Sequence, residues 1–159
     1  MKTPRSTLSL AAEYAVASEL CRRGIYAQLT FGYQKRTDIL VFDLKTNKML
    51  RIEVKAKQGD SFPNCRGIFG GNVFLILVDF QNKKLGERPD FYILSEKDWI
   101  DFVKSAIKKY PYVELNQENC PVWVKQITKS GKPYMGIGIK PDQVSTYKER
   151  WNKIELELS

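Results

Sequence analysis

Residues Thr37–Lys57 read TDILVFDLKTNKMLRIEVKAK. This stretch predicts two β-strands, Thr37–Leu44 and Met49–Lys57, joined by the polar turn Lys45–Lys48. Because side chains alternate along a strand, one face of the hairpin is apolar, and it consists of Ile39, Val41, Leu50, Ile52 and Val54. The other face mixes apolar residues with charged ones, and the charged residues need an explanation.

The charged residues of that second face are Asp38, Glu53 and Lys55. When Leu44 pairs with Met49 across the turn, Asp38 lies opposite Lys55. Directly opposed Cβ atoms lie about 4.5–5.5 Å apart and diagonal ones about 7–8 Å apart, so the three side chains form one cluster. A register slip of one residue would bury Asp38 without a partner among apolar side chains, which costs free energy. We therefore expect the charges to converge.

Two interpretations of this cluster remain open: a cross-strand ion pair on a solvent-facing hairpin, and a metal site. Two carboxylates held together repel each other unless a cation lies between them. Mg²⁺ suits an all-oxygen pair beside a lysine, because it takes a few carboxylates, several waters and substrate phosphate oxygens. The sequence has no histidine, which excludes Ser-His-Asp and Cys-His catalysis and histidine-ligated metals.

The composition is typical of one globular domain: 159 residues, of which 43% are hydrophobic and 28% charged. The net charge of +8 favours an anionic partner, nucleic acid first, with a generally basic surface as the alternative. No apolar run approaches the ~20 residues of a membrane span, and Glu13 and Glu19 interrupt any signal-peptide core. We therefore expect a cytoplasmic protein without a membrane segment, whose Cys21, Cys65 and Cys120 are reduced thiols.

Outside the hairpin, the pattern predicts helices and further strands. Ser6 is a candidate N-cap for a helix over Thr7–Arg23, and Ser95 for a helix that ends near Lys109. The other expected elements are the strands Ile25–Phe31, Asn72–Phe80 (buried and central) and Asp90–Leu94, a hairpin of Pro121–Thr128 and Pro133–Ile139, and a helix over Pro141–Trp151. Residues 59–71 carry turn residues throughout and are expected to be irregular. Together these elements predict a single mixed α/β domain.

A helix bearing a glutamate, followed by a strand hairpin with Asp and then Glu-x-Lys, resembles the PD-(D/E)XK nuclease superfamily. The matching residues are Glu13 in AAEYAVASELCRRG, Asp38 in TDILVFD, and Glu53 with Lys55 in RIEVKAKQ, and Thr37 stands where the pattern has a proline. Residues 7–95 are similar to small stand-alone members such as the archaeal Holliday junction resolvases. The resemblance implies the restriction-endonuclease-like fold, an αβββαβ-type core with a mixed central sheet and flanking helices, as one domain over residues 1–159.

The same resemblance implies metal-dependent hydrolysis of DNA phosphodiester bonds, with branched or junction DNA as one expected substrate. Mg²⁺ is the expected cofactor and Mn²⁺ a substitute. Asp38, Glu53 and the backbone carbonyl of Val54 would hold the metal, and Lys55 would orient the attacking water. Glu13, on the apolar stripe of its helix, would approach the metal directly or through water. A lysine flanked by carboxylates stays protonated, which favours electrostatic orientation over a general-base role.

Lys35, Arg36 and Lys57 bracket the expected site and are candidates for phosphate contacts, and Gln58 is a candidate polar contact just beyond the motif. A solvated strand end is the alternative for each of them. A homodimer would suit an enzyme that cuts two strands. Two alternatives to an enzyme remain open: a nuclease-fold module that binds nucleic acid without cleaving it, and a basic domain that binds an acidic protein.

Overall fold

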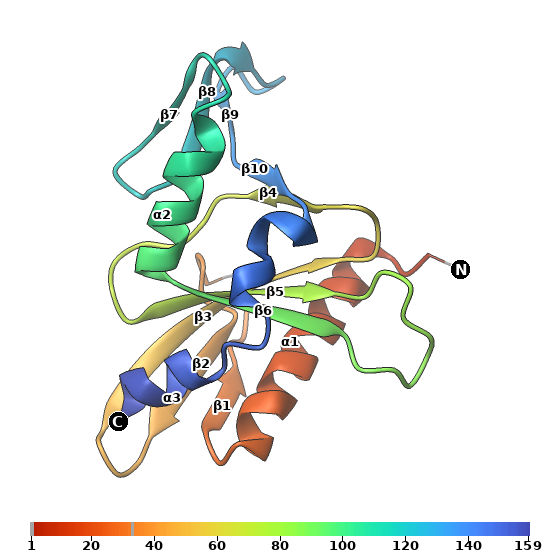
Figure 1. Ribbon diagram of the computed structural model, residues 1–159, viewed down its shortest axis with the longest axis vertical. Coiled ribbons are helices and arrows are strands. Elements are labelled where there is room, and N and C mark those ends of the chain that lie inside the picture. Colours follow the sequence, from red (N-terminus) through yellow and green to blue (C-terminus); the bar gives the residue numbers. More distant parts are fainter. Residues whose placement is uncertain (1, 33) are drawn as a thin grey trace.

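The computed structural model describes residues 2–32 and 34–159, and a five-stranded mixed sheet lies at its centre (Figure 1). The strands lie in the order β1-β2-β3-β5-β6; β3 and β5 run parallel, and the other neighbours run antiparallel. Their bounds are β1 Tyr26–Leu29, β2 Ile39–Asp43, β3 Lys48–Lys57, β5 Val73–Asp79 and β6 Asp90–Ser95. The mixed sheet with flanking helices confirms the predicted α/β class.

Helices cover both faces of this sheet (Figure 1). α1 (Arg5–Arg22) and α3 (Asn152–Leu158) pack on one face, whereas α2 (Glu96–Ile107) and the 3-10 helix η1 (Pro141–Tyr147) pack on the other. The helices bury Ala12, Val16, Leu20, Ile154 and Leu158 on the first face and Trp99, Val103 and Val144 on the second. Along the described residues, none of the helices is long and apolar enough to cross a membrane.

β5 is the central strand that the sequence predicts, and every one of its residues is buried. Its side chains alternate between the two cores: Phe74, Ile76 and Val78 face α1, and Val73, Leu75 and Leu77 face α2. A strand that removes apolar surface from water on both faces gains about 25 cal/mol for each Å² that it buries. This double burial explains why the run is apolar throughout rather than alternating.

The register of the β2–β3 hairpin differs from the expectation by two residues. Asp43 pairs with Lys48 and Phe42 with Met49, and continuing this register places Asp38 opposite Glu53 instead of Lys55. The turn sets the register, because the backbone N–H of Lys45 donates to Oδ1 of Asp43 at 2.7 Å and tightens the loop. A change of two residues keeps every side chain on its predicted face. The apolar face is accordingly buried as predicted, with Ile39, Val41, Leu50, Ile52 and Val54 each at most 7% exposed.

The predicted N-cap is absent in α1 and present in α2. α1 begins at Arg5 directly after Pro4, and no side chain caps it, so the expected cap at Ser6 is wrong. A proline with its fixed φ suits the start of a helix, and Ser6 therefore lies within the first turn. At α2 the expected cap is confirmed: Ser95 and Asp98 form a reciprocal capping box.

Residues 59–71 are not wholly irregular, because they contain the strand β4 (Phe62–Cys65), which pairs with β10 (Ile137–Ile139). The expected strand over Pro133–Ile139 is broken at Gly136, whose φ is 100°. A Cβ at that position would lie 3.1 Å from the backbone of Asn64, so only glycine allows this close approach. The chain therefore leaves its hairpin at Gly136 and pairs with β4.

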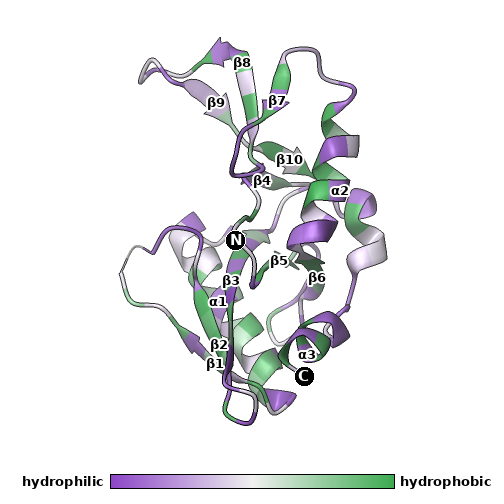
Figure 2. Cartoon of the chain, turned by 90° about the vertical axis from the view of Figure 1, so that its left-hand side faces the viewer, coloured by the Kyte–Doolittle hydropathy of each residue, from purple (hydrophilic) through white to green (hydrophobic). Residues whose placement is uncertain are grey.

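A second sheet stands away from the central one, as both views show (Figures 1 and 2). It consists of β7 (Val113–Leu115), β8 (Pro121–Ile127) and β9 (Pro133–Met135) in that order. The β8–β9 hairpin is confirmed, whereas the three-residue β7 is too short to show a pattern. The expected helix over Pro141–Trp151 is only partly correct, because η1 ends at Tyr147 and the chain then turns before α3.

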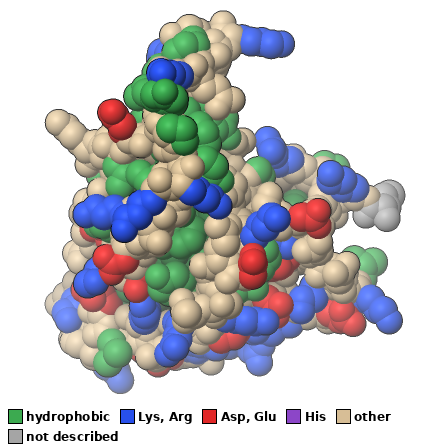
Figure 3. Space-filling view, turned by 45° about the horizontal axis from the view of Figure 1, so that its top comes forward, with side chains coloured by type: hydrophobic (Ala, Val, Ile, Leu, Met, Phe, Trp, Pro, Cys, Tyr) green, Lys and Arg blue, Asp and Glu red, His purple; other side chains and the backbone are tan. Residues whose placement is uncertain are grey.

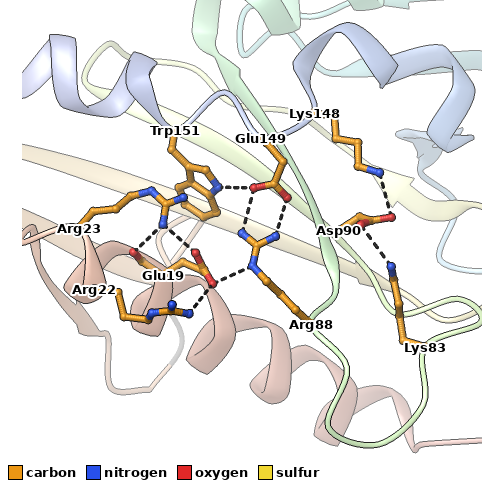
Figure 4. A network of polar contacts seen from close by, with 9 residues as sticks. All are labelled: Glu19, Arg22, Arg23, Lys83, Arg88, Asp90, Lys148, Glu149 and Trp151. Atoms are coloured by element: carbon orange, nitrogen blue, oxygen red, sulfur yellow. Dashed lines mark hydrogen bonds and ion pairs between the residues drawn. The ribbon is translucent and has the colours of Figure 1, made fainter.

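An ion-pair network ties the C-terminal segment to α1 (Figure 4). Arg88 donates to both carboxylate oxygens of Glu149 at 2.8 and 2.9 Å, and its Nε donates to Glu19 at 2.9 Å. Arg23 also donates to Glu19, at 2.7 Å, and Trp151 donates to Glu149 at 2.8 Å. The hydrogen bond from Arg88 lowers the pKa of Glu19 to about 2 against the opposing effect of burial, and Arg23 adds to it.

Candidate active site

Asp38 lies just before β2 and is held by two hydrogen bonds to β3. Its backbone N–H donates to the carbonyl of Ile52 at 2.8 Å, and its Oδ2 accepts from the backbone N–H of Val54 at 2.7 Å. These bonds bracket Glu53, so the two carboxylates are neighbours. Burial raises the pKa of Asp38 to about 6, and repulsion by Glu53 adds to the effect, whereas the Val54 hydrogen bond opposes it.

Glu53 and Lys55 project from the same face of β3 and form an ion pair with Nζ and Oε1 2.7 Å apart. The Glu53 side chain is only 9% exposed, and that of Lys55 is 35% exposed. Burial alone would lower the pKa of Lys55, but the charge and hydrogen bond of Glu53, with the charge of Asp38, raise it above its ordinary value. Lys55 is therefore a stable ammonium at neutral pH.

Glu13 reaches the same cluster from α1, where it is half-buried. Burial raises its pKa, repulsion by Glu53 raises it further, and Lys55 acts in the opposite direction. Its charge also raises the pKa of Asp38. The structure thus brings together the four residues that the sequence motif selects, two from the hairpin's β3 strand, one from the entry to β2 and one from the helix.

Asp38, Glu53 and Lys55 line a polar cleft of about 290 Å³. Three basic side chains, Lys35, Arg36 and Arg66, line the same cleft. Asn64 lines it as well. The cleft is therefore lined by two carboxylates and by several basic side chains. Such an arrangement suits a ligand whose charge is negative and which brings a cation with it.

The donors in the cleft fit a hard divalent cation that keeps some of its own waters. Among the described residues, no group of three Cys, Asp or Glu side chains is arranged to hold a metal by itself. Asp38 and Glu53 offer two carboxylates, and Val54 a backbone carbonyl between them in sequence. Mg²⁺ commonly uses one or two carboxylates and takes waters and phosphate oxygens for the rest. The pKa of Asp38 is raised first by burial and then by the negative charge of Glu53, and a cation between the two carboxylates would oppose both effects.

Lys35 and Arg36 are held at the rim of the cleft by one acidic residue. Glu118, in the loop between β7 and β8, accepts from Lys35 at 3.0 Å through Oε1, and its Oε2 lies 3.0 Å from Arg36. Arg36 is only 10% exposed on its side chain and also lies over the ring of Phe69 at 5.0 Å. The Lys35 hydrogen bond, with help from both positive charges, lowers the pKa of Glu118.

Lys57 and Gln58 lie away from this cleft. The side chain of Lys57 is 1% exposed, pairs with Asp79 at 2.7 Å and donates to Gln81 at 2.8 Å. Gln58 exchanges two hydrogen bonds with the backbone of Thr3, at 3.0 and 2.7 Å. Both side chains therefore serve the architecture around the end of β3, and we no longer expect Lys57 to contact phosphates.

Glu118, which pairs with two residues of the cleft, and Asn64, which lines it, are not predicted from the sequence. Glu118 lies more than 80 positions from its partners Lys35 and Arg36, and no local pattern connects them. Asn64 reaches the cleft because β4 pairs with β10, and its one local signal is a φ of 52°, which asparagine tolerates better than most residues.

No protein-family model matches the chain, and no curated protein sequence matches it significantly. Among solved structures, the chain is similar to a bacterial homing endonuclease, I-Ssp6803I. The match covers 98% of this chain and 94% of that chain, with a TM-score of 0.51 and 13% sequence identity. At this identity the likeness concerns the fold alone, and the chain has a nuclease-like fold.

Proposed function

We propose that this protein is a metal-dependent endonuclease of the PD-(D/E)XK type, which hydrolyses phosphodiester bonds in DNA. One observation carries the proposal: Asp38, Glu53 and Lys55 line a single polar cleft, and Glu13 is near enough for its charge to raise the pKa of Asp38. The nuclease-like fold supports it. The net charge of +8 supports an anionic substrate.

Asp38 and Glu53 would hold Mg²⁺ or Mn²⁺, with the carbonyl of Val54 as a further donor. When bound, the ion supplies charge neutralisation at the phosphoryl oxygens and makes water more acidic. The Val54 N–H keeps the Asp38 carboxylate in place before the ion arrives, since it occupies one carboxylate oxygen at 2.7 Å. This preorganisation avoids a rearrangement of the protein when the cation binds.

Lys55 would orient the attacking water and stabilise negative charge in the transition state. Its raised pKa argues against accepting a proton, because the ammonium is already stabilised by Glu53 at 2.7 Å. Glu13, half-buried and with a raised pKa, would accept a hydrogen bond from a water that bridges to the site. Lys35, Arg36 and Arg66 line the cleft walls and would contact the phosphates next to the reacting bond.

The proposal has finer parts that rest on the resemblance of Glu13, Asp38 and Glu53-x-Lys55 to the superfamily pattern. We propose that residues 1–159 act as one nuclease domain, that branched or junction DNA is among its substrates, and that two copies pair to cut two strands. We place the protein in the cytoplasm. Its three cysteines, all free thiols in the structure, support a reducing compartment.

The proposal is tested with purified protein and a panel of plasmid, linear duplex, single-stranded and four-way-junction DNA in Mg²⁺ or Mn²⁺. We expect cleavage that EDTA stops. Glu53→Gln, purified in parallel, should be inactive and excludes a contaminating nuclease, whereas Glu114→Gln, exposed on β7, should be active. Binding without cleavage of any substrate would replace the enzyme by a binding module. A wild-type protein that DNA does not retain at low salt would favour a protein-binding domain.

A further inference from the structure

The outer half of the β8–β9 hairpin is exposed over most of its length. It projects from the body in both views (Figures 1 and 2), and Val124, Lys125, Gln126 and Ile127 are all exposed. The tip is nevertheless ordered by hydrogen bonds, because the backbone N–H of Thr128 donates to the carbonyl of Lys132 at 2.8 Å. The hairpin is therefore an ordered, projecting ribbon whose outer residues are accessible to a partner.

This ribbon is uniformly basic. Residues 121–135 include Lys125, Lys129 and Lys132, all exposed, and neither Asp nor Glu. The space-filling view shows basic and hydrophobic side chains together at the projecting end (Figure 3). A surface that carries only positive charge, on a ribbon with no salt-bridge partners in its own sequence, is complementary to a polyanion.

The base of the hairpin is fixed to the candidate active site. The hydroxyl of Tyr134 on β9 hydrogen-bonds the side chain of Asn64, which lines the same cleft as Asp38. On β8, Trp123 donates to the carbonyl of Gly136 at 2.9 Å, at the point where the chain leaves for β10. The base of the hairpin therefore lies beside the cleft.

The contacts favour duplex DNA over the two other occupants of a basic ribbon. A single strand would need free aromatic faces for its bases, but Lys125 lies 3.2 Å from the ring centroid of Tyr112, and Tyr110 packs on Trp123 at 5.1 Å. A symmetric second copy would set these lysines against the same lysines of its partner, which repel. A two-stranded ribbon fits the major groove of a duplex, about 12 Å wide.

We propose that the β8–β9 hairpin is a second DNA-contacting element, which holds the duplex that flanks the bond in the cleft through Lys125, Lys129 and Lys132. This inference rests on the proposed function, because it assigns the hairpin to the same substrate. It predicts in addition that affinity depends on the length of the duplex. A duplex that fills only the cleft lacks the contacts of the hairpin, whereas a longer duplex gains them.

The test compares the triple variant Lys125→Gln, Lys129→Gln, Lys132→Gln with a control of equal charge, Lys45→Gln, Lys84→Gln, Lys97→Gln, whose sites are exposed on other elements. Affinity is measured by fluorescence anisotropy for labelled duplexes of about 8 and about 30 bp, which span about 27 and about 100 Å at 3.4 Å per base pair. Ca²⁺ replaces Mg²⁺ so that the DNA is not cleaved while its affinity is measured. Melting temperatures establish that both variants are folded, and Lys129→Gln alone, at the turn, serves if the triple variant is not.

We expect the hairpin variant to bind the long duplex at least about tenfold more weakly than the control, with a salt dependence reduced by about two to three phosphate contacts. Its affinity for the short duplex should stay within about twofold of the control. Equal affinities of both variants for the long duplex would overturn the inference while leaving the proposed function intact. If the wild-type protein binds neither duplex, the proposed function and the inference fall together, and the two failures are therefore distinguishable.

Discussion

The backbone N–H of Val54 donates a hydrogen bond to Oδ2 of Asp38 at 2.7 Å. This bond joins the entry of β2 to β3 and holds the Asp38 carboxylate beside Glu53 although the two repel each other. Ionised Asp38 is disfavoured in this place: burial first, and then the charge of Glu53, raise its pKa to about 6. The site is therefore electrostatically strained, and under the proposed function a bound cation would relieve that strain.

We expect Asp38→Asn to stabilise the metal-free protein and to abolish cleavage. Because the pKa of Asp38 rises from 3.8 to about 6 on folding, its ionisation destabilises the folded state increasingly between about pH 4 and 6 and fully above that range. Asparagine removes this penalty and can still accept the Val54 hydrogen bond. The gain should be up to about 3 kcal/mol at pH 7.5 and should shrink towards pH 4, as measured by urea unfolding in EDTA. Asp142→Asn, exposed at the start of η1, is the control, and a less stable Asp38→Asn protein at pH 7.5 would contradict the expectation.

Lys55→Ala separates a catalytic lysine from a structural one. Loss of one preorganised charge in the site should lower the cleavage rate by about 10²-fold or more. Removing the partner of the buried Glu53 should also cost about 1–2 kcal/mol of stability, so the rate is measured well below the melting temperature. Affinity for DNA in Ca²⁺ should stay within about threefold of wild type. Lys104→Ala, exposed on α2, is the control. A folded Lys55→Ala protein that cuts at nearly the wild-type rate would rule out the proposed role.

Glu118→Gln should strengthen DNA binding. In the free protein, Glu118 engages Lys35 and Arg36 at 3.0 Å each, so phosphates must displace a carboxylate before they reach these cations. Neutralising it should raise affinity by about 3- to 10-fold at low salt and steepen the salt dependence by about one contact. Glu114→Gln on the same sheet removes an equal charge without those partners and is the control. Equal effects of the two substitutions would mean that only net charge matters.

Glu19→Gln should lower the free energy of unfolding by an amount that depends on pH. The hydrogen bond from Arg88 lowers the pKa of Glu19 from 4.5 to about 2, so its stabilisation is complete above about pH 5 and is lost as pH falls towards 2. The loss in the variant should be at most about 3 kcal/mol at pH 7, reduced because the partner arginines are partly exposed, and should vanish near pH 2. Thermal unfolding from pH 2 to pH 7, with Glu114→Gln for comparison, measures it. A constant difference between variant and wild type over this pH range would contradict the assigned cause.

The sequence by itself determines which side chains share a face. The alternation of side chains along the hairpin places Asp38, Glu53 and Lys55 on one face and the apolar residues on the other. This assignment of faces is correct although the predicted register is wrong by two residues, because side chains repeat their direction every two residues. The uniformly apolar β5 predicts a central strand, and the Ser95 cap predicts the start of α2. Each of these features depends on residues that are close together in the chain.

Only the tertiary structure decides what surrounds those residues. The register of the hairpin depends on the turn, where Lys45 donates to Asp43. The role of Lys57 depends on its burial, which pairs it with Asp79. Glu118 meets Lys35 and Arg36, and Asn64 meets Tyr134, across long separations in the sequence. Such pairs leave no periodic signal, because their proximity results from the packing of whole elements rather than from the geometry of one strand or helix.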